Sequence, residues 1–418
     1  MNILMIDPDI LPDKGSFGSF EKAEFLRIIK ENRQRHFLLA KEFSSFGANV
    51  LLIRPELSFD KKAPIEFYQR DGISMASVRV FGKKSEKTAC IKEEILFSSS
   101  VYKNSACFGG IFTPGAVICA GTLPTACSAA AKIAEDRNCV LITELACSPK
   151  EFLLSSKAVS SLNPVFAVLK KECRTAFEKS DAVIGFFPKA QSCFSHSSGI
   201  FPAELPPIEY CKEPSSKAVM AFEKLCAFKE GGAFLLCCAV PLEFGFSIDE
   251  LMAVCSGFDK KFSLVFLLEG TKKKYYRHLA AEKSLTNVFF AEDIPAEELS
   301  YILSAADGVY LSENGFLKGF APEQDVFSQV FLSGRPVIAA AEHWADFFRK
   351  SGGTIITKPR NKESIRLGIK ALLEMPCADR DILGESNKSF AEKISFKNFA
   401  KEYYSLTDNL VKQKENIK

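Results

Sequence analysis

The chain contains few of the residues that build metal and nucleic-acid sites. Among its 418 residues there are four histidines and one tryptophan, and the formal net charge is only +3. A nucleic-acid-binding domain would carry a clear basic surplus, so nucleic acid is not an expected partner. The four histidines are scattered, which is not the pattern of a histidine-rich metal site. We therefore expect neither a bound metal nor a cofactor.

The 14 cysteines form no C-x-x-C pair, although Cys237 and Cys238 are adjacent. Zinc ligands need closer spacing, and a disulfide framework is typical of small extracellular chains. Small apolar thiols packed in a core fit this scattered pattern better. The sequence therefore predicts reduced cysteines and a cytoplasmic location.

The chain also lacks a clean membrane-spanning or export segment. Residues Met1–Asp7 have no basic start and reach an acidic residue too early for a signal peptide. The longest uncharged stretch, Asn104–Ala131, is interrupted by Pro114 and Pro124. We interpret it as a strand at Ala116–Ala120, a loop and a helix, rather than a membrane span.

What the chain does have is a repeated strand–helix pattern, first in its N-terminal half. A buried strand at Ile3–Ile6 is followed by a glycine-containing loop, a long helix at Phe20–Phe46 and a second strand at Val50–Ile53. This beginning is typical of a Rossmann-like unit. Further strands are predicted at Met75–Val80, Ala116–Ala120, Val140–Thr143 and Ala182–Phe186.

A second series follows a proline-rich break at Phe201–Ser216, which we interpret as an interdomain linker. The first apolar strand after it is Phe234–Ala239. A helix is then predicted at Ile248–Phe258, with Ser247 as its N-cap residue. Later elements are predicted as strands at Phe262–Leu268 and Thr354–Ile356 and as helices at Lys362–Leu373 and from Phe390 onward.

The stretch Asn287–Ile338 is the most informative part of this second half. It contains a short strand at Asn287–Phe290, a helix beginning near Pro295, a strand at Val309–Leu311, and a helix that runs into Gly334 before a last strand. Two acidic residues follow Pro295 in the first helical turn, where they meet the positive end of the helix dipole. This βαβαβ order is typical of a nucleotide-binding α/β domain.

The same stretch resembles the donor-binding domain of GT-B glycosyltransferases, family 4. In the N-terminal half, Arg35 through Ala40, Gly47 through Val50, and Asp181 also match family patterns. The resemblance implies an α/β fold of two facing Rossmann-like domains, with a C-terminal helix that crosses back to the first. It implies an acceptor domain at 1–205, completed by 396–418, and a nucleotide-sugar donor domain at 217–395.

The resemblance further implies a retaining, metal-independent transferase for a hexose or an amino sugar. The donor would be a UDP- or GDP-linked sugar, and the acceptor a glycan, a lipid-linked molecule or a small molecule. Asn163, Pro164 and Glu172 resemble a branch that makes bacterial surface polysaccharides. Such enzymes are cytoplasmic, with peripheral contact at the inner face of the membrane as an option.

Site residues are implied by the same resemblance. Gly15, Ser16 and Gly18, after the first strand, would form an acceptor or phosphate loop. The donor site would be formed by Gly270, Thr271, Lys272, Glu313, Asn314, Lys318 and Gln329. No catalytic residue is identified, and neither His36 nor His196 is assigned a catalytic role.

The chain departs from the family pattern in its donor site. An acidic residue usually stands five positions before the glycine that corresponds to Gly334, and here that position is Gln329. Val326 replaces a frequent lysine, and the loop Val240–Gly245 has no base. Lys272, Lys273 and Lys274, together with Lys318, are the cations that would partly replace the missing ones. These departures support a second hypothesis, a catalytically inactive GT-B homologue that serves as a partner or scaffold of an active transferase.

Overall fold

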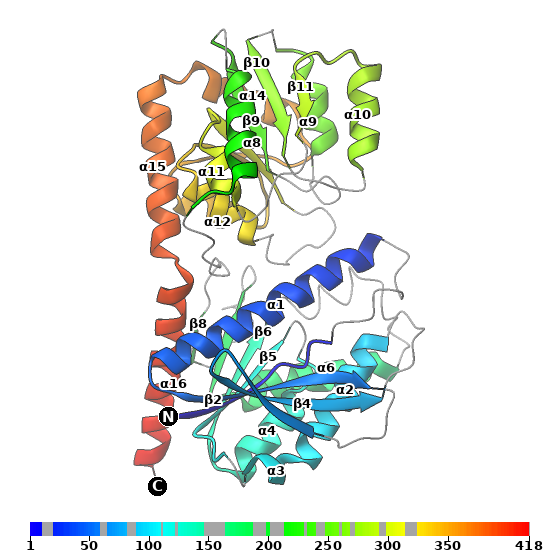
Figure 1. The fold of residues 1–418 in the computed structure, drawn as a ribbon, viewed down its shortest axis with the longest axis vertical. Helices are drawn as coiled ribbons and strands as arrows, with labels where there is room; N and C mark the ends of the chain where they lie inside the picture. Colours follow the sequence, from blue (N-terminus) through cyan, green and yellow to red (C-terminus); the bar gives the residue numbers. More distant parts are fainter. Residues whose placement is uncertain are drawn as a thin grey trace. The chain divides into compact units, whose positions relative to one another are not determined.

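The structure is a computed structural model of the 418-residue chain. The described residues are all except 11–19, 59–64, 82–88, 110–111, 122–123, 146–163, 187–197, 201–212, 230–231, 240–246, 259–260, 268–271, 292–297, 314–323 and 418. The chain divides into two compact units (Figure 1). Unit 1 holds Met1–Ala203 and Lys397–Lys418, and unit 2 holds most of the residues between them.

Unit 1 is built on an eight-stranded sheet in the order β3-β4-β2-β1-β5-β6-β7-β8. All neighbouring strands are parallel except β3 and β4, which pair antiparallel. The strands are β1 (Asn2–Ile6), β2 (Asn49–Ser58), β3 (Ile65–Arg70), β4 (Ile73–Phe81), β5 (Ala116–Gly121), β6 (Val140–Leu145), β7 (Ala182–Gly185) and β8 (Ser198–Ile200).

Helices cover both faces of this sheet because its central strands are buried on both sides. The helices are α1 (Phe20–Ser45), α2 (Ala89–Lys103), α3 (Ser105–Gly109), α4 (Cys127–Asp136), α6 (Pro164–Lys179) and α16 (Phe396–Asn416). Apolar side chains of α2, α4 and α6 form one core with alternate residues of β1, β2, β4, β5 and β6. On α1, Phe43 packs edge-on against Tyr403 of α16, with 5.3 Å between ring centroids.

Unit 2 has an all-parallel six-stranded sheet in the order β11-β10-β9-β12-β13-β14. Its strands are β9 (Phe234–Cys238), β10 (Phe262–Phe266), β11 (Val288–Phe290), β12 (Gly308–Ser312), β13 (Val337–Ala340) and β14 (Thr354–Thr357). Its helices are α8 (Ser216–Ala227), α9 (Ile248–Cys255), α10 (Lys273–Glu282), α11 (Leu299–Leu303), α12 (Gln324–Leu332), α13 (Ala345–Lys350), α14 (Lys362–Glu374) and α15 (Cys377–Lys393).

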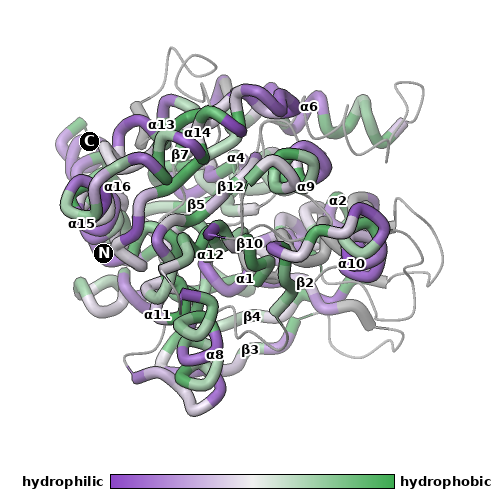
Figure 2. Tube along the Cα trace, turned by 90° about the horizontal axis from the view of Figure 1, so that it is seen from above, coloured by the Kyte–Doolittle hydropathy of each residue, from purple (hydrophilic) through white to green (hydrophobic). Residues whose placement is uncertain are grey.

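The central strands of unit 2 are also buried on both faces. Helices α9, α10 and α14 share one apolar core with β9, β10, β12 and β13. On α8, α11, α12 and α15 the contacts run from one helix to the next: α8 contacts α11, α11 contacts α12, and α12 contacts α15. All five residues of β10 are buried, whereas much of helix α15 is hydrophilic (Figure 2). This is the burial pattern that a sheet between two helical layers requires.

The predicted fold class, α/β with two parallel-sheet domains, is confirmed. The C-terminal helix α16 packs on unit 1, where the Lys414 Nζ donates to the Cys139 carbonyl at 2.8 Å. The predicted domain limits stay a prediction, since most of the linker at Phe201–Ser216 lies outside the described residues. Ser216 itself is the first residue of α8, for which Ser215 is the N-cap.

The uncharged stretch Asn104–Ala131 contains α3, β5 and the first half of α4 within unit 1. All six residues of β5 are buried in the sheet. In the part of the chain that the structure describes, no helix is both long and apolar enough to cross a membrane.

Candidate functional sites at two switch points

Both sheets reverse the direction of their crossovers at one place. In unit 1 this place lies between β1 and β5, and in unit 2 it lies between β9 and β12. Open parallel sheets bind ligands beyond the carboxyl ends of their strands at such a switch point. Polar side chains just after β1 and just after β12 are therefore the first place to search for function.

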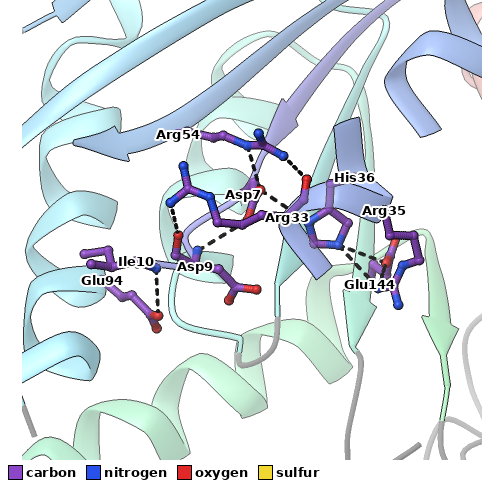
Figure 3. A network of polar contacts seen from close by, with 9 residues as sticks. All are labelled: Asp7, Asp9, Ile10, Arg33, Arg35, His36, Arg54, Glu94 and Glu144. Carbon is purple, nitrogen blue, oxygen red and sulfur yellow. Dashed lines mark hydrogen bonds and ion pairs between the residues drawn. The ribbon is translucent and has the colours of Figure 1, made fainter. Parts of the chain in front are cut away.

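In unit 1, charged side chains of alternating sign lie at this edge (Figure 3). Asp7 follows β1, and its Oδ2 accepts from Arg54 Nε of β2 at 2.9 Å. The same oxygen lies 3.4 Å from Nδ1 of His36 on α1. On the other side of the ring, Nε2 lies 3.2 Å from Oε1 of Glu144 in β6, and that oxygen also accepts from Arg35 Nη2 at 2.6 Å.

This arrangement fixes the charge state of the buried imidazole. Burial by itself would lower the pKa of His36, but Asp7 and Glu144 outweigh it and raise the pKa to about 9. Burial likewise opposes ionisation of Asp7, yet His36 and Arg54 hold its pKa below the ordinary value. The pKa of Glu144 is lowered against its own burial by Arg35 and His36. At neutral pH the series is therefore Arg⁺, Asp⁻, His⁺, Glu⁻, Arg⁺.

The carboxyl groups of Asp7 and Glu94 hold the backbone that follows β1. The Asp9 amide donates to Asp7 Oδ1 at 3.3 Å, and Arg33 Nη1 donates to the Asp9 carbonyl at 2.8 Å. The Ile10 amide donates to Oε1 of Glu94 on α2 at 3.3 Å. Burial and the neighbouring Asp9 raise the pKa of Glu94 well above its ordinary value, which favours the protonated form of this carboxyl.

The network also reaches the C-terminal helix. The guanidinium of Arg35 lies over the Phe186 ring, 4.5 Å from its centroid, and Phe186 packs against Phe399 of α16. Glu144 and Arg35 both act electrostatically on the hydroxyl of Tyr403, whose pKa burial raises well above its ordinary value. The network therefore joins β1, β2, β6, α1 and α16 around the edge of the sheet. Its role is to hold these elements in position.

At the switch point of unit 2, Glu313 follows β12 and holds the loop after β13. Its Oε1 accepts from the backbone amides of Glu342 at 2.8 Å and Trp344 at 2.6 Å. Its Oε2 lies 3.4 Å from Nδ1 of His343. The predicted donor residue Glu313 is thus a buried anchor for the neighbouring loop.

Gln329 and Lys272 are the other predicted donor residues that the structure describes. Gln329 lies on α12, is buried, and its Oε1 accepts from the Ser300 amide at the start of α11 at 3.0 Å. Lys272 is exposed at the beginning of α10, whereas the adjacent Lys273 is buried and its Nζ donates to the Ala291 carbonyl at 2.7 Å. The donor roles of Gln329 and Lys272 stay predictions.

The remaining predicted site residues lie outside the described residues: Gly15, Ser16, Gly18, Gly270, Thr271, Asn314 and Lys318. Among the described ones, no group of three or more His, Cys, Asp or Glu side chains is arranged to hold a metal ion.

Sequence reasoning missed the charged network of unit 1. The sequence assigned His36 no catalytic role, and it assigned Glu144 no role in a site. The signal lay in the topology: Asp7 and Glu144 each stand at the carboxyl end of a predicted parallel strand, so their side chains meet at one edge. His343 was missed as well, because nothing in its local sequence separates it from a surface histidine.

No protein-family model matches the sequence, and no curated protein matches it. Solved structures do resemble it over nearly its whole length. Sucrose-phosphate synthase from Thermosynechococcus elongatus has 12% identity and a TM-score of 0.64, with 98% of each chain covered. HepE from Anabaena, solved with UDP-glucose, has 13% identity and a TM-score of 0.56, with 98% of this chain and 99% of that one covered.

A third similar structure is WaaG, a glycosyltransferase involved in lipopolysaccharide biosynthesis. It has 13% identity and a TM-score of 0.58, and the match covers 97% of this chain and 99% of WaaG. Because the match spans both units, the fold of this chain is that of the GT-B glycosyltransferases. Identities this low show the fold and nothing finer.

Proposed function

We propose that this protein is a glycosyltransferase that moves a sugar from a nucleotide-sugar donor to an acceptor. The observation that carries the proposal is the match to glycosyltransferase structures over 97–98% of the chain, with both sheets included. Two of the similar structures contain UDP or UDP-glucose. We assign the donor to the carboxyl edge of unit 2 and the acceptor to that of unit 1.

The finer parts of the proposal are family 4, a retaining and metal-independent reaction, and a cytoplasmic role in polysaccharide biosynthesis. The likeness to WaaG supports a lipid-linked or glycan acceptor. In the donor site, we propose that Lys272 contacts the diphosphate, because it is an exposed cation at the start of α10. Amides at the helix start add to that attraction.

Gln329 is the residue that most clearly tests this donor site. Its one acceptor oxygen is already bonded to the Ser300 amide. A glutamate there would have two acceptor oxygens, one for that amide and one for a ribose hydroxyl. Gln329→Glu should therefore preserve or tighten nucleotide affinity.

Calorimetry with UDP, GDP, ADP and their glucose conjugates tests the proposal. Wild-type protein should bind at least one nucleotide, and Lys272→Ala should weaken that binding by about 2 kcal/mol, the range of a charge-assisted contact. Lys283→Ala is the matched control, an exposed lysine at the other end of α10. If no nucleotide binds at millimolar concentration and Gln329→Glu changes nothing, the scaffold hypothesis replaces this one.

A further inference from the structure

The loop after β13 is anchored without the side chain of His343. The two backbone bonds from Glu342 and Trp344 to Glu313 Oε1 hold its path, and the Glu313 amide donates to the Ala340 carbonyl at 3.0 Å. These contacts join the ends of β12 and β13. An imidazole is not needed for them, so its contact with the same carboxylate calls for a separate explanation.

The imidazole of His343 is oriented by Glu313 and partly exposed. The glutamate side chain is 4% exposed, and the histidine side chain is 34% exposed. A carboxylate oxygen only accepts hydrogen bonds, so Nδ1 carries the hydrogen that lies toward Oε2. In the neutral ring, Nε2 then keeps its lone pair and is a hydrogen-bond acceptor.

The position of this pair is the second observation. Glu313 follows β12, one of the two strands that flank the switch point of unit 2, and His343 follows the neighbouring strand β13. Ligands of such sheets bind beyond the carboxyl ends of these strands. A partly exposed acceptor of fixed tautomer at that edge is suited to a hydroxyl group, which both ribose and hexose provide.

We propose that His343 is a specificity-determining residue of the donor site. Its Nε2 accepts a hydrogen bond from a hydroxyl of the bound nucleotide sugar, and Glu313 is the positioning residue that fixes the ring. This inference rests on the proposed function. It also assigns Glu313 an indirect role, through His343, in place of direct contact with the donor.

Two substitutions separate the two ring nitrogens. In His343→Asn the amide nitrogen replaces Nδ1 and keeps the bond to Glu313, but no acceptor reaches the place of Nε2. In His343→Gln the amide oxygen does reach that place. Calorimetry with the nucleotide and nucleotide sugar that the wild type binds should show about tenfold weaker binding for His343→Asn, equal to about 1.4 kcal/mol. His343→Gln should recover part of the loss.

A further variant keeps the loop anchor intact. In Glu313→Gln, the amide oxygen still accepts from the two backbone amides, while the amide nitrogen faces Nδ1. The ring must then take the other tautomer, with hydrogen on Nε2, and lose its acceptor. Glu313→Gln should weaken binding as His343→Asn does. His278→Asn, an exposed histidine on α10, should bind as the wild type does.

The ligand panel identifies the hydroxyl. An equal loss for the free nucleotide and its glucose conjugate assigns the contact to the ribose, and a loss for the conjugate alone assigns it to the transferred sugar. Wild-type affinity in both His343→Asn and Glu313→Gln overturns this inference and leaves the proposed function standing. A wild-type protein that binds no nucleotide overturns both.

Discussion

Glu94 is a carboxyl group whose pKa the fold raises well above its ordinary value. It is buried beside Asp9 and Asp7, with Arg33 of α1 bonded to the Asp9 carbonyl, and its Oε1 accepts from the Ile10 amide. Its raised pKa means that ionisation favours the unfolded chain. The contribution to stability is therefore complete below about pH 4.5, the ordinary pKa of glutamate, and is lost as the pH rises toward the folded pKa.

Glu94→Gln should remove this loss, because the amide keeps an acceptor for Ile10 and cannot ionise. The variant should equal the wild type near pH 4.5 and become increasingly more stable as the pH rises. Hydrogen exchange in peptides that cover β1 measures the difference at each pH. Glu94→Ala is the contrast: it leaves the Ile10 amide unpaired and should cost about 1–3 kcal/mol at neutral pH. A pH-independent difference between Glu94→Gln and wild type would refute the assignment.

His36 is held in its charged form, and its stabilising contribution begins to be lost at a higher pH than that of Glu94. Its folded pKa of about 9 lies above the ordinary 6.5. Its stabilising contribution is thus complete below pH 6.5 and lost between there and pH 9. His36→Gln should destabilise unit 1 at pH 6 by a few kcal/mol, since it leaves Asp7 and Glu144 without their shared cation. The deficit should shrink by pH 9.

Hydrogen exchange in β1 and β6 at pH 6, 7.5 and 9 is the measurement for His36→Gln. His278→Gln is the control, because that histidine is exposed on α10. A deficit of the same size at pH 6 and pH 9 would show that the imidazole is not held in its charged form.

At the scale of elements, the two units repeat one device. An aspartate stands just before a strand and accepts from the amide of the second residue of the neighbouring strand: Asp181 Oδ2 accepts from Leu141 at 2.7 Å, and Asp307 Oδ2 accepts from Leu235 at 2.9 Å. Asp181 also pairs with Lys414 of α16 at 3.4 Å. Asp181, which the sequence resemblance singled out, and Asp307 therefore have the same structural role in the two sheets.

The buried strands were predictable from sequence, and elements that depend on distant partners were not. Continuous apolar runs located β1, β5, β6, β9 and β12 to within a residue or two. β3 (Ile65–Arg70) was missed because five of its six residues are exposed, so it forms by pairing with β4 rather than by burial.

Ser247 was predicted as an N-cap, and it occupies that position without capping. Its φ is +74°, and its Oγ accepts from the Arg360 amide, 113 residues away.

The same limit applies to the candidate sites. The strand ends that carry Asp7 and Glu313 follow from the predicted order of strands, as does the expectation of a ligand at that edge. Their partners do not, because His36 and His343 are brought to them by a helix and a loop whose packing no local pattern encodes. Contacts between residues 29 or more positions apart are decided by the tertiary fold.

Helix α15 packs unusually close to the turn before β13, and Gly384 makes this possible. A Cβ at Gly384 would lie 2.0 Å from the Gly334 carbonyl oxygen. Nearby, the Asn387 amide donates to the Arg335 and Gly353 carbonyls at 2.9 and 3.0 Å. Gly to Ala within a helix is normally stabilising by about 1 kcal/mol. Here the clash is with backbone, so Gly384→Ala should instead destabilise unit 2 by about 1–3 kcal/mol.

The fluorescence of Trp344, the only tryptophan and a buried residue of unit 2, reports this unfolding. Glu385→Ala is the control, since its side chain is exposed one residue further along α15. An unchanged or raised stability in Gly384→Ala would mean that α15 does not approach the Gly334 turn this closely.

For the molecule as a whole, the two units have similar topology, but the carboxyl edges of their sheets differ. We therefore predict that a ligand stabilises the two units unequally. The edge of unit 1 is occupied by its own ion pairs, whereas at the edge of unit 2 His343 is partly exposed. A free nucleotide without acceptor should therefore stabilise unit 2 first. At one hundred times its dissociation constant, a ligand adds about 2.7 kcal/mol to the free energy of unfolding of the unit that binds it.

Trp344 fluorescence follows unit 2 during urea unfolding, and hydrogen exchange in β1 and β6 follows unit 1. The midpoint reported by Trp344 should rise with nucleotide concentration while exchange in β1 and β6 changes less. Stabilisation confined to unit 1 would move the donor site to the other sheet and contradict the roles proposed for Lys272, Gln329 and His343.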